Sequence, residues 1–194
     1  MKRIGIFGGS FNPIHVGHAL IARYIVENTK LDTLWLMVSP LNPLKENSDL
    51  ASDYHRLRMT ELVSRRLDNV ETSAFEFNLP KPSFTIDTLN ALQAKFPDDE
   101  FYLVIGADNW CVFDRWKSGE EIISKYHILI YPRRGYDIVI PEQYRDRVEV
   151  VDAPIIEISS TEVRNRLSQL KSVSFYVPDA VEQYIFENRL YIKF

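Results

Sequence analysis

The chain has 194 residues, of which 45% are hydrophobic and 26% are charged. This length fits one domain, and the composition is typical of a globular protein and excludes a disordered one. We therefore expect residues 1–194 to form a single domain. The 23 basic and 27 acidic residues give a formal net charge of −4. This balance argues against a broad nucleic-acid surface, because such a surface neutralises many phosphates at once.

The cysteine content and the apolar runs bear on the cellular compartment. A single cysteine, Cys111, excludes an internal disulfide bond and supplies too little sulfur for a zinc ribbon or an iron–sulfur site. No stretch approaches the ~20 apolar residues of a membrane span, and residues 4–7 are too short a run for a secretory signal. We expect a cytoplasmic protein with no membrane or nucleic-acid partner. Its oligomeric state, homo-oligomer or monomer, is left open.

Strand-like and helix-like runs alternate along the chain. Short apolar runs predict strands at residues 2–7, 33–38, 70–73, 101–105 and 127–131, with at least one more within 148–158. Helical spacing predicts helices at residues 16–28, 53–67, 83–96, 161–170 and 178–188. Such alternation favours βαβ units. We expect an α/β fold with a Rossmann-like, doubly wound, mostly parallel sheet flanked by helices, and a small helical extension at the C-terminal end.

The segment GGSFNPIHVGH follows the first predicted strand. Here Gly8 and Gly9 would let the backbone turn tightly and bring its N–H groups toward a ligand. His15 and His18 are three residues apart at a predicted helix start, so both can share one face, and Gly17 between them permits a close approach. Helix N-terminal amides combined with two imidazoles indicate an anion site.

Other phosphate and metal motifs do not fit this segment. It lacks both the Gly-Lys-Ser/Thr of a Walker A loop and the G-x-G-x-x-G spacing. A zinc site would need a third ligand, and the chain has no H-E-x-x-H pattern, so no protein-bound metal is expected. A purely structural role, in which the histidines cap and pack a helix, explains either His15 or His18 alone but not the combined string.

A second polar segment, ISSTEVR, follows an apolar run late in the chain. Ser159 and Glu162 fit a capping box, which alone would be a structural feature. The three consecutive hydroxyl residues Ser159, Ser160 and Thr161, with Arg164 one turn inside the helix, suit the triphosphate of a nucleotide.

These two segments resemble the H-x-G-H and I-S-S-T-x-I/V-R signatures of the nucleotidylyltransferase superfamily, with Ser10 in place of threonine and Asn12 in place of aspartate. Three further segments, SFTIDTL, IGADN with Trp116, and SPLNPLK ending at Lys45, resemble the bacterial nicotinate-nucleotide adenylyltransferases. The resemblance covers almost the whole chain. Leu44 before the loop lysine departs from the family pattern, as does the Lys81-Pro82 pair before the serine, and both positions concern the acceptor phosphate.

The resemblance implies transfer of the adenylyl group of ATP to nicotinate mononucleotide, giving nicotinate adenine dinucleotide and pyrophosphate. The acceptor phosphate is already an anionic nucleophile, so Cys111 and a general base need not take part. Mg²⁺ would be carried mainly by the ATP phosphates. His15, His18 and Arg164 are the implied catalytic residues. The implied ATP site comprises Gly8, Gly9, Ser10, Phe11, His15, His18, Gly106, Asp108, Ser159, Ser160, Thr161 and Arg164. The implied acceptor site comprises Lys45, Ser83, Phe84, Thr85, Asp108, Trp116 and Arg133.

Several acceptor-site residues also have a structural interpretation. Trp116 could stack on a pyridine ring or anchor a surface turn. Asp108 could hold ribose hydroxyls or cap a helix. Ser83 could present backbone amides to a carboxylate or act as an N-cap. Arg133 could add charge near the acceptor or lie in a solvated turn.

We interpret Trp35 and Trp110 as supporting residues and expect His55, Arg56 and Arg58 on a solvated helix face. Three alternative functions remain open. A pantetheine-phosphate adenylyltransferase would have an acceptor without an aromatic ring, and so no purpose for Trp116. A nicotinamide-nucleotide adenylyltransferase differs only by one carboxylate of its substrate. A nucleotide-binding regulator would have no reason to keep both histidines.

Overall fold

Six parallel strands form one sheet in a computed structural model that describes residues 1–40 and 50–192. The strands are β1 (Arg3–Gly9), β2 (Thr33–Val38), β3 (Val70–Ser73), β4 (Glu100–Gly106), β5 (His127–Tyr131) and β6 (Val148–Val150). Their order across the sheet is β3-β2-β1-β4-β5-β6, and every neighbouring pair is parallel. The predicted parallel sheet is therefore confirmed, with β1 extending two residues beyond its expected end.

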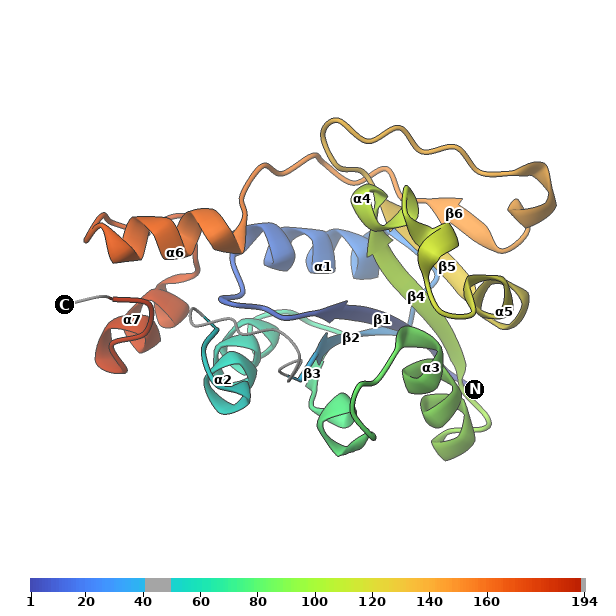
Figure 1. Ribbon diagram of the computed structural model, residues 1–194, viewed down its shortest axis with the longest axis horizontal. Helices are drawn as coiled ribbons and strands as arrows, with labels where there is room; N and C mark the ends of the chain where they lie inside the picture. The colour runs from blue at the N-terminus through green and yellow to red at the C-terminus, as the bar shows by residue number, and fades with distance from the viewer. Residues whose placement is uncertain (41–49, 193–194) are drawn as a thin grey trace.

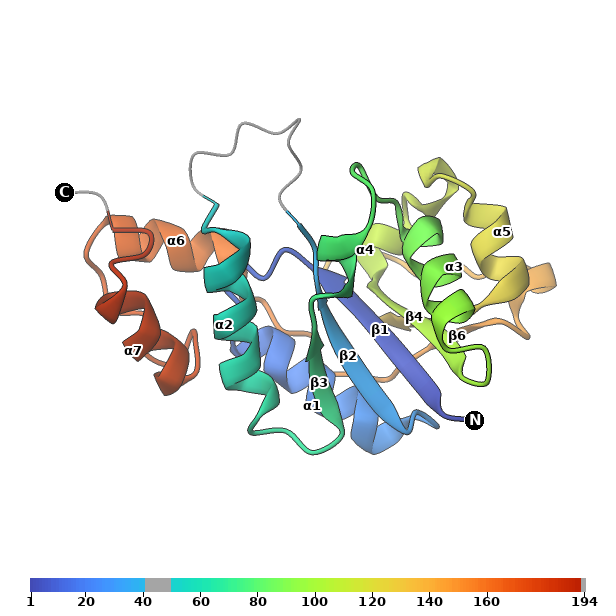
Figure 2. The same cartoon turned by 90° about the horizontal axis from the view of Figure 1, so that it is seen from below.

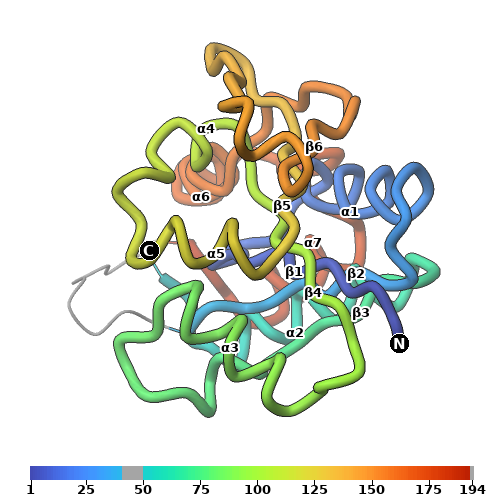
Figure 3. Tube along the Cα trace, turned by 90° about the vertical axis from the view of Figure 1, so that its right-hand side faces the viewer, coloured from blue at the N-terminus to red at the C-terminus, as the bar shows by residue number. Residues whose placement is uncertain are grey.

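Helices cover both faces of this sheet, as predicted (Figures 1 and 3). Figure 1 shows α1 above the strands and α3 below them. The α-helices are α1 (Val16–Asn28), α2 (Asp53–Ser64), α3 (Thr85–Lys95), α4 (Ala107–Trp110), α5 (Gly119–Lys125), α6 (Ser160–Ser168) and α7 (Asp179–Glu187). Short 3-10 turns occupy η1 (Phe75–Asn78), η2 (Phe113–Arg115) and η3 (Glu142–Tyr144). None of the helices in the described part of the chain is long and apolar enough to cross a membrane.

The two faces of the sheet bury separate hydrophobic clusters. Successive side chains of a strand point to opposite faces, and accordingly Leu36 belongs to one cluster and Met37 to the other. Ile25 of α1 is packed in the first cluster, whereas Leu89 of α3 and Ile122 of α5 are packed in the second. Strands that are buried on both faces read as continuous apolar runs, which is why the sequence predicted them.

The C-terminal helices α6 and α7 lie together at one end of the molecule, past the ends of α1 and α2 (Figures 1 and 2). Val163 and Leu167 of α6 and Val181 and Ile185 of α7 are buried in the same cluster as α1. A backbone hydrogen bond of 2.9 Å from the N–H of Val16 to the carbonyl of Tyr176, just before α7, joins this extension to the start of α1. The predicted C-terminal helical extension is thus confirmed.

Some helix predictions need correction. The helix expected at 83–96 begins at Thr85, and the one expected at 53–67 ends at Ser64. The sequence did not predict α4 or α5, which have four and seven residues. Helices of one or two turns present too few residues for a helical period to be recognised. The strand order reverses between β1 and β4, which is where ligands bind in open α/β sheets.

The prediction that Arg56 lies on a solvated face of α2 is also wrong, because its side chain is 0% exposed. Its guanidinium donates hydrogen bonds to backbone carbonyls instead of meeting water. His55 is half-buried, with Nδ1 2.9 Å from the hydroxyl of Tyr184. Arg58 is paired with Glu61 and is also half-buried. The prediction failed because the acceptors of Arg56 come from other segments of the chain.

Candidate active site

Two adjoining cavities open at the carboxyl ends of the central strands, the first at β1 and β4 and the second at β1 and β5. The first is lined by Gly8 and Gly9 of β1, Gly106 of β4, Thr85 of α3 and Trp116. The second is lined by His15, His18 and Arg133, together with hydrophobic residues of the 156–158 segment. Phe7 and Tyr131 line both cavities. Segments that the sequence predicted separately therefore meet at the point where the strand order reverses.

The turn after β1 differs from the expected one. Gly8 and Gly9 do not form it, because both belong to the strand. Phe11 instead adopts the left-handed conformation, with φ of 44°, and its side chain is 2% exposed. Its ring packs edge-on against His18, with the centroids 5.1 Å apart. A Cβ added to Gly8 would meet nothing within 4 Å, so this position borders open space.

His15 and His18 stack against each other at the start of α1, with ring centroids 3.7 Å apart. The backbone N–H of His15, the N-cap residue, donates a hydrogen bond of 3.2 Å to Nδ1 of His18. Because Nδ1 is the acceptor, the neutral ring carries its proton on Nε2, which is then free to act as a donor. A Cβ at Gly17 would lie 2.9 Å from His15 Nδ1, so the glycine leaves room for the imidazole ring itself.

Both histidines are uncharged at neutral pH. Burial lowers the pKa of His15 from 6.5 to about 3, and the positive charge of Arg133 acts in the same direction. Burial also holds the pKa of His18 well below its ordinary value, with smaller contributions from His15 and Arg133. A bound anion would raise both pKa values by stabilising the protonated rings.

Three buried polar atoms without a hydrogen-bond partner distinguish this region. Within residues 1–40 and 50–192, four buried side-chain polar atoms lack a hydrogen-bond partner: His15 Nδ1, Asp108 Oδ1, Arg133 Nε and Trp35 Nε1. The first three lie at the carboxyl ends of the strands, with Arg133 Nε 3.7 Å from Asp108 Oδ1. Leaving such a group unpaired costs about 1–3 kcal/mol, so a cluster of them indicates a polar ligand.

The N-terminus of α6 is docked on the turn after β1. Ser160 Oγ donates a hydrogen bond of 2.9 Å to the carbonyl of Pro13. Arg164 donates through Nη1 to the carbonyl of Asn12 at 2.8 Å, and through Nη2 to Thr161 Oγ1 at 3.3 Å. The two signature segments, far apart in the sequence, are thus brought into direct contact.

The caps of α6 and α4 settle two structural interpretations. Ser159 is the N-cap of α6, and its Oγ accepts the N–H of Glu162 at 3.1 Å, which is the serine half of the predicted capping box. Gly106, not Asp108, occupies the N-cap position of α4. Asp108 lies in the first turn of that helix, beside Arg133.

Two of the predicted acceptor residues, Thr85 and Trp116, line the same cavity. Trp116 packs on Phe113 with ring centroids 5.1 Å apart. The N-cap of α3 is Phe84, not Ser83. The backbone N–H of Phe84 donates a hydrogen bond of 3.2 Å to the Asp87 carboxylate. Lys117 lies 4.4 Å above the Phe84 ring and 3.1 Å from Asp87. These contacts join the start of α3 to the residue after Trp116.

One predicted acceptor residue stands apart from the cavity beside Trp116, and another falls outside the described part of the chain. Arg133 lies with the histidines and donates a 3.3 Å hydrogen bond to the hydroxyl of Tyr131, whereas the cavity beside Trp116 does not include it. Lys45 lies outside the described residues. The sequence analysis did not single out Tyr131, although its position at the end of a buried strand was a usable signal.

Comparisons with known proteins identify the family. A family model described as cytidylyltransferase-like matches residues 6–166. The probable nicotinate-nucleotide adenylyltransferase of Bacteroides fragilis is 46% identical over 185 residues, covering 95% of this chain and 92% of the relative. The protein of the same name from Flavobacterium psychrophilum is 39% identical over 193 residues, covering 98% of this chain and 100% of the relative. The chain belongs to the nicotinate-nucleotide adenylyltransferase family.

The fold is shared with solved structures. Plasmodium falciparum nicotinic acid mononucleotide adenylyltransferase, complexed with NaAD, superposes with a TM-score of 0.80 at 21% identity, and the match covers 98% of both chains. The same enzyme complexed with APC gives a TM-score of 0.79. The family resemblance and the Rossmann-like fold that the sequence predicted are both confirmed.

Proposed function

We propose that the protein transfers the adenylyl group of ATP to nicotinate mononucleotide, forming nicotinate adenine dinucleotide and pyrophosphate in NAD biosynthesis. The observation that carries this proposal is the cluster of buried polar atoms that lack a hydrogen-bond partner, His15 Nδ1, Asp108 Oδ1 and Arg133 Nε, at the carboxyl ends of the strands. Donors and an acceptor in that position suit a ligand that carries both phosphates and hydroxyls. Membership of the family indicates which ligands these are.

The reaction is an in-line displacement at the α-phosphorus of ATP. An oxygen of the acceptor phosphate forms the new P–O bond, and the bond to the pyrophosphate oxygen breaks, so no proton has to be removed from the nucleophile. The barrier is then lowered by positioning and by stabilising charge on the transferred group and the leaving pyrophosphate. Among the described residues, the site supplies neutral donors and a guanidinium for this purpose.

Each element contributes a different part of the nucleotide site. We assign the Nε2–H of His18 to the α-phosphate and His15 to the adjoining phosphates. Ser160, Thr161 and Arg164, at the N-terminus of α6, would hold the β- and γ-phosphates, where the helix dipole also favours an anion. Gly8, Gly9 and Gly106 line the cavity at the carboxyl ends of β1 and β4. We also assign Ser10, Phe11, Asp108 and Ser159 to the ATP site.

The acceptor would lie beside Trp116, whose ring can stack on the pyridine of nicotinate. Backbone amides near Thr85 at the start of α3 suit its carboxylate, and Asp108 suits ribose hydroxyls. Ser83 and Phe84 flank this position. Lys45 and Arg133 remain assigned to the acceptor phosphate.

We treat Mg²⁺ as part of the substrate, bound to ATP. Its preferred oxygen ligands can come from the phosphates and from water. Within the described residues, no three His, Cys, Asp or Glu side chains gather in a group suited to a metal ion. We also propose that residues 1–194 act as a single domain in the cytoplasm, which the single cysteine supports.

An acceptor comparison tests the proposed function. Pyrophosphate release from ATP and Mg²⁺ is measured with nicotinate mononucleotide, nicotinamide mononucleotide, phosphopantetheine or no acceptor. We expect kcat/KM for nicotinate mononucleotide to exceed the others by at least about tenfold, ~1.4 kcal/mol. A higher value for phosphopantetheine, or no release with any acceptor, would contradict the proposal.

A further inference from the structure

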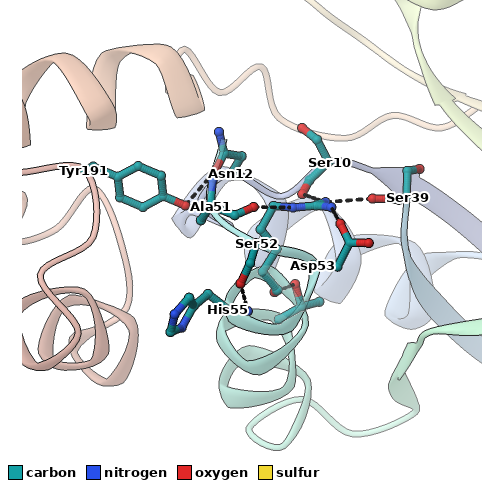
Figure 4. A network of polar contacts seen from close by, with 10 residues as sticks. Ser10, Asn12, Ser39, Ala51, Ser52, Asp53, His55 and Tyr191 are labelled. Carbon is teal, nitrogen blue, oxygen red and sulfur yellow. Dashed lines mark hydrogen bonds and ion pairs between the residues drawn. The ribbon is translucent and has the colours of Figure 1, made fainter. Parts of the chain in front are cut away.

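A fully buried guanidinium lies beneath the proposed ATP site and has no part in the chemistry described so far. Arg56 of α2 is 0% exposed. Its Nη1 donates to the carbonyls of Ser10 at 2.6 Å and Ser39 at 2.7 Å, and its Nε donates to the carbonyl of Ala51 at 3.1 Å. Its Nη2 forms an ion pair of 2.5 Å with Asp53 (Figure 4).

The acceptors of Arg56 belong to three separate segments. Ser10 lies in the turn after β1, Ser39 follows the end of β2, and Ala51 precedes α2. A single planar group with donors in a fixed fork therefore sets the relative positions of these three backbones. Burying a charge is costly, and a well-packed apolar side chain of similar volume often stabilises a fold as well or better. At this position, however, an apolar side chain would leave the carbonyls of Ser10, Ser39 and Ala51 without their donor, so the guanidinium is needed to hold these three backbones together.

A second contact joins the same turn to Ala51, just before α2. Asn12 Oδ1 accepts the N–H of Ala51 at 3.0 Å and the hydroxyl of Tyr191 at 2.7 Å (Figure 4). Ser10 and Asn12 flank Phe11, whose ring packs against His18. The backbone on both sides of Phe11 is therefore held by hydrogen bonds to Arg56 and Ala51. Because the Phe11 ring packs against His18, the position of this backbone also affects the position of the His18 ring.

We propose that Arg56 is a positioning residue for adenylyl transfer: it holds the Ser10 carbonyl, and with it the turn that places Phe11 against His18. This inference rests on the proposed function and adds to it a residue that touches neither substrate. Misplacing reacting groups by about 1 Å can cost roughly 10²-fold in rate. A small displacement of this turn is therefore enough to impair catalysis without unfolding the protein.

The test compares Arg56→Lys with Arg58→Lys. Lysine keeps the positive charge at position 56, but its ammonium group cannot reproduce the fork that spans Ser10, Ser39 and Ala51. Arg58 lies on the same helix and is paired with Glu61, so its lysine variant is the matched control. We expect kcat of Arg56→Lys to fall by about 10- to 100-fold, with KM for ATP within about threefold of wild type. Arg58→Lys should retain wild-type kcat.

Hydrogen exchange supplies a readout that does not depend on the reaction. Backbone amides of residues 8–14 should exchange faster in Arg56→Lys than in wild type or Arg58→Lys, while amides of β4 and β5 keep their protection. The inference is overturned by an Arg56→Lys protein with kcat within twofold of wild type and unchanged exchange at residues 8–14. Equal losses of kcat in both lysine variants would also overturn it. Loss of protection throughout the sheet would mean that Arg56→Lys has not kept its fold, and Asp53→Asn then decides.

A second variant decides the matter if Arg56→Lys does not fold. Asp53→Asn removes the ion pair of Nη2 and leaves the guanidinium in place. A fall in kcat of at least threefold, with a melting temperature equal to that of Arg58→Lys, supports the inference, and wild-type kcat overturns it. Should the wild-type protein form no nicotinate adenine dinucleotide, the proposed function fails, and hydrogen exchange alone then judges the positioning of the turn.

Discussion

At the scale of single residues, the proposed work of His15 and His18 depends on their being neutral. Burial opposes protonation of both rings, and Arg133 adds a repelling charge. A neutral imidazole that accepts at Nδ1, as His18 does from the His15 N–H, presents Nε2–H as a donor. These two histidines can therefore hold phosphate oxygens without acting as bases.

The same burial makes stability depend on pH. Between the ordinary pKa of 6.5 and the folded-state pKa of about 3, the unfolded chain binds a proton at His15 that the folded chain excludes. Stability therefore falls as the pH drops through this window, by about 2 kcal/mol between pH 7 and pH 5. His18, with its lowered pKa, acts in the same direction, whereas Glu76, with its raised pKa, acts in the opposite one.

Urea unfolding of wild type and His15→Gln at pH 7 and pH 5 checks this prediction. We expect the loss of unfolding free energy on acidification to be smaller in His15→Gln by about 2 kcal/mol. The comparison between variants cancels the contribution of Glu76. An identical loss in His15→Gln and wild type would show that His15 does not titrate as described.

Some of these residues could be predicted from the sequence and others could not. The pair His15 and His18 was predictable because helical spacing alone places them on one face. Arg56 was not, because its acceptors are the carbonyls of Ser10 and Ser39, 46 and 17 residues away. The left-handed conformation of Phe11 was equally hidden, since neighbouring glycines were the expected site of the turn.

At the scale of elements, the docking of α6 on the turn after β1 unites the two halves of the proposed ATP site. The hydrogen bond from Ser160 to the Pro13 carbonyl is one of its direct ties. We expect Ser160→Ala to lower the unfolding free energy by about 1 kcal/mol and to raise KM for ATP, because the hydroxyl docks the helix end that we propose holds the phosphates.

Steady-state kinetics and thermal unfolding of Ser160→Ala measure both effects. Ser168→Ala is the matched control, because its Oγ donates only within α6, to the carbonyl of Asn165 at 3.0 Å. Ser168→Ala should keep the wild-type KM for ATP. A Ser160→Ala protein with wild-type KM would remove Ser160 from the nucleotide site.

The elements also differ in how well the sequence predicts them. The buried strands were found because their apolar runs end at Gly, Pro or Ser. The α4 and α5 helices were missed because they are short, with four and seven residues. The contact between Phe84 and Lys117 could not be foreseen, since it depends on how α3 and the segment after Trp116 approach each other.

At the scale of the whole molecule, the strand order brings the chemistry together. Only an order that reverses between β1 and β4 places the ends of these two strands side by side, with Gly8 and Gly106 lining one cavity. The returning chain then brings α6 to the same crevice. We propose that groups positioned there, rather than a nucleophilic side chain, accelerate adenylyl transfer.

The turnover of His18→Ala tests whether these positioned groups carry the catalysis. We expect kcat with ATP and nicotinate mononucleotide to fall about 10²- to 10³-fold. The unfolding free energy should drop by only about 1 kcal/mol, because the His15 N–H loses its acceptor. His127→Ala, which alters a histidine at the start of β5, should retain wild-type kcat. A folded His18→Ala protein with kcat within a few-fold of wild type would contradict the account.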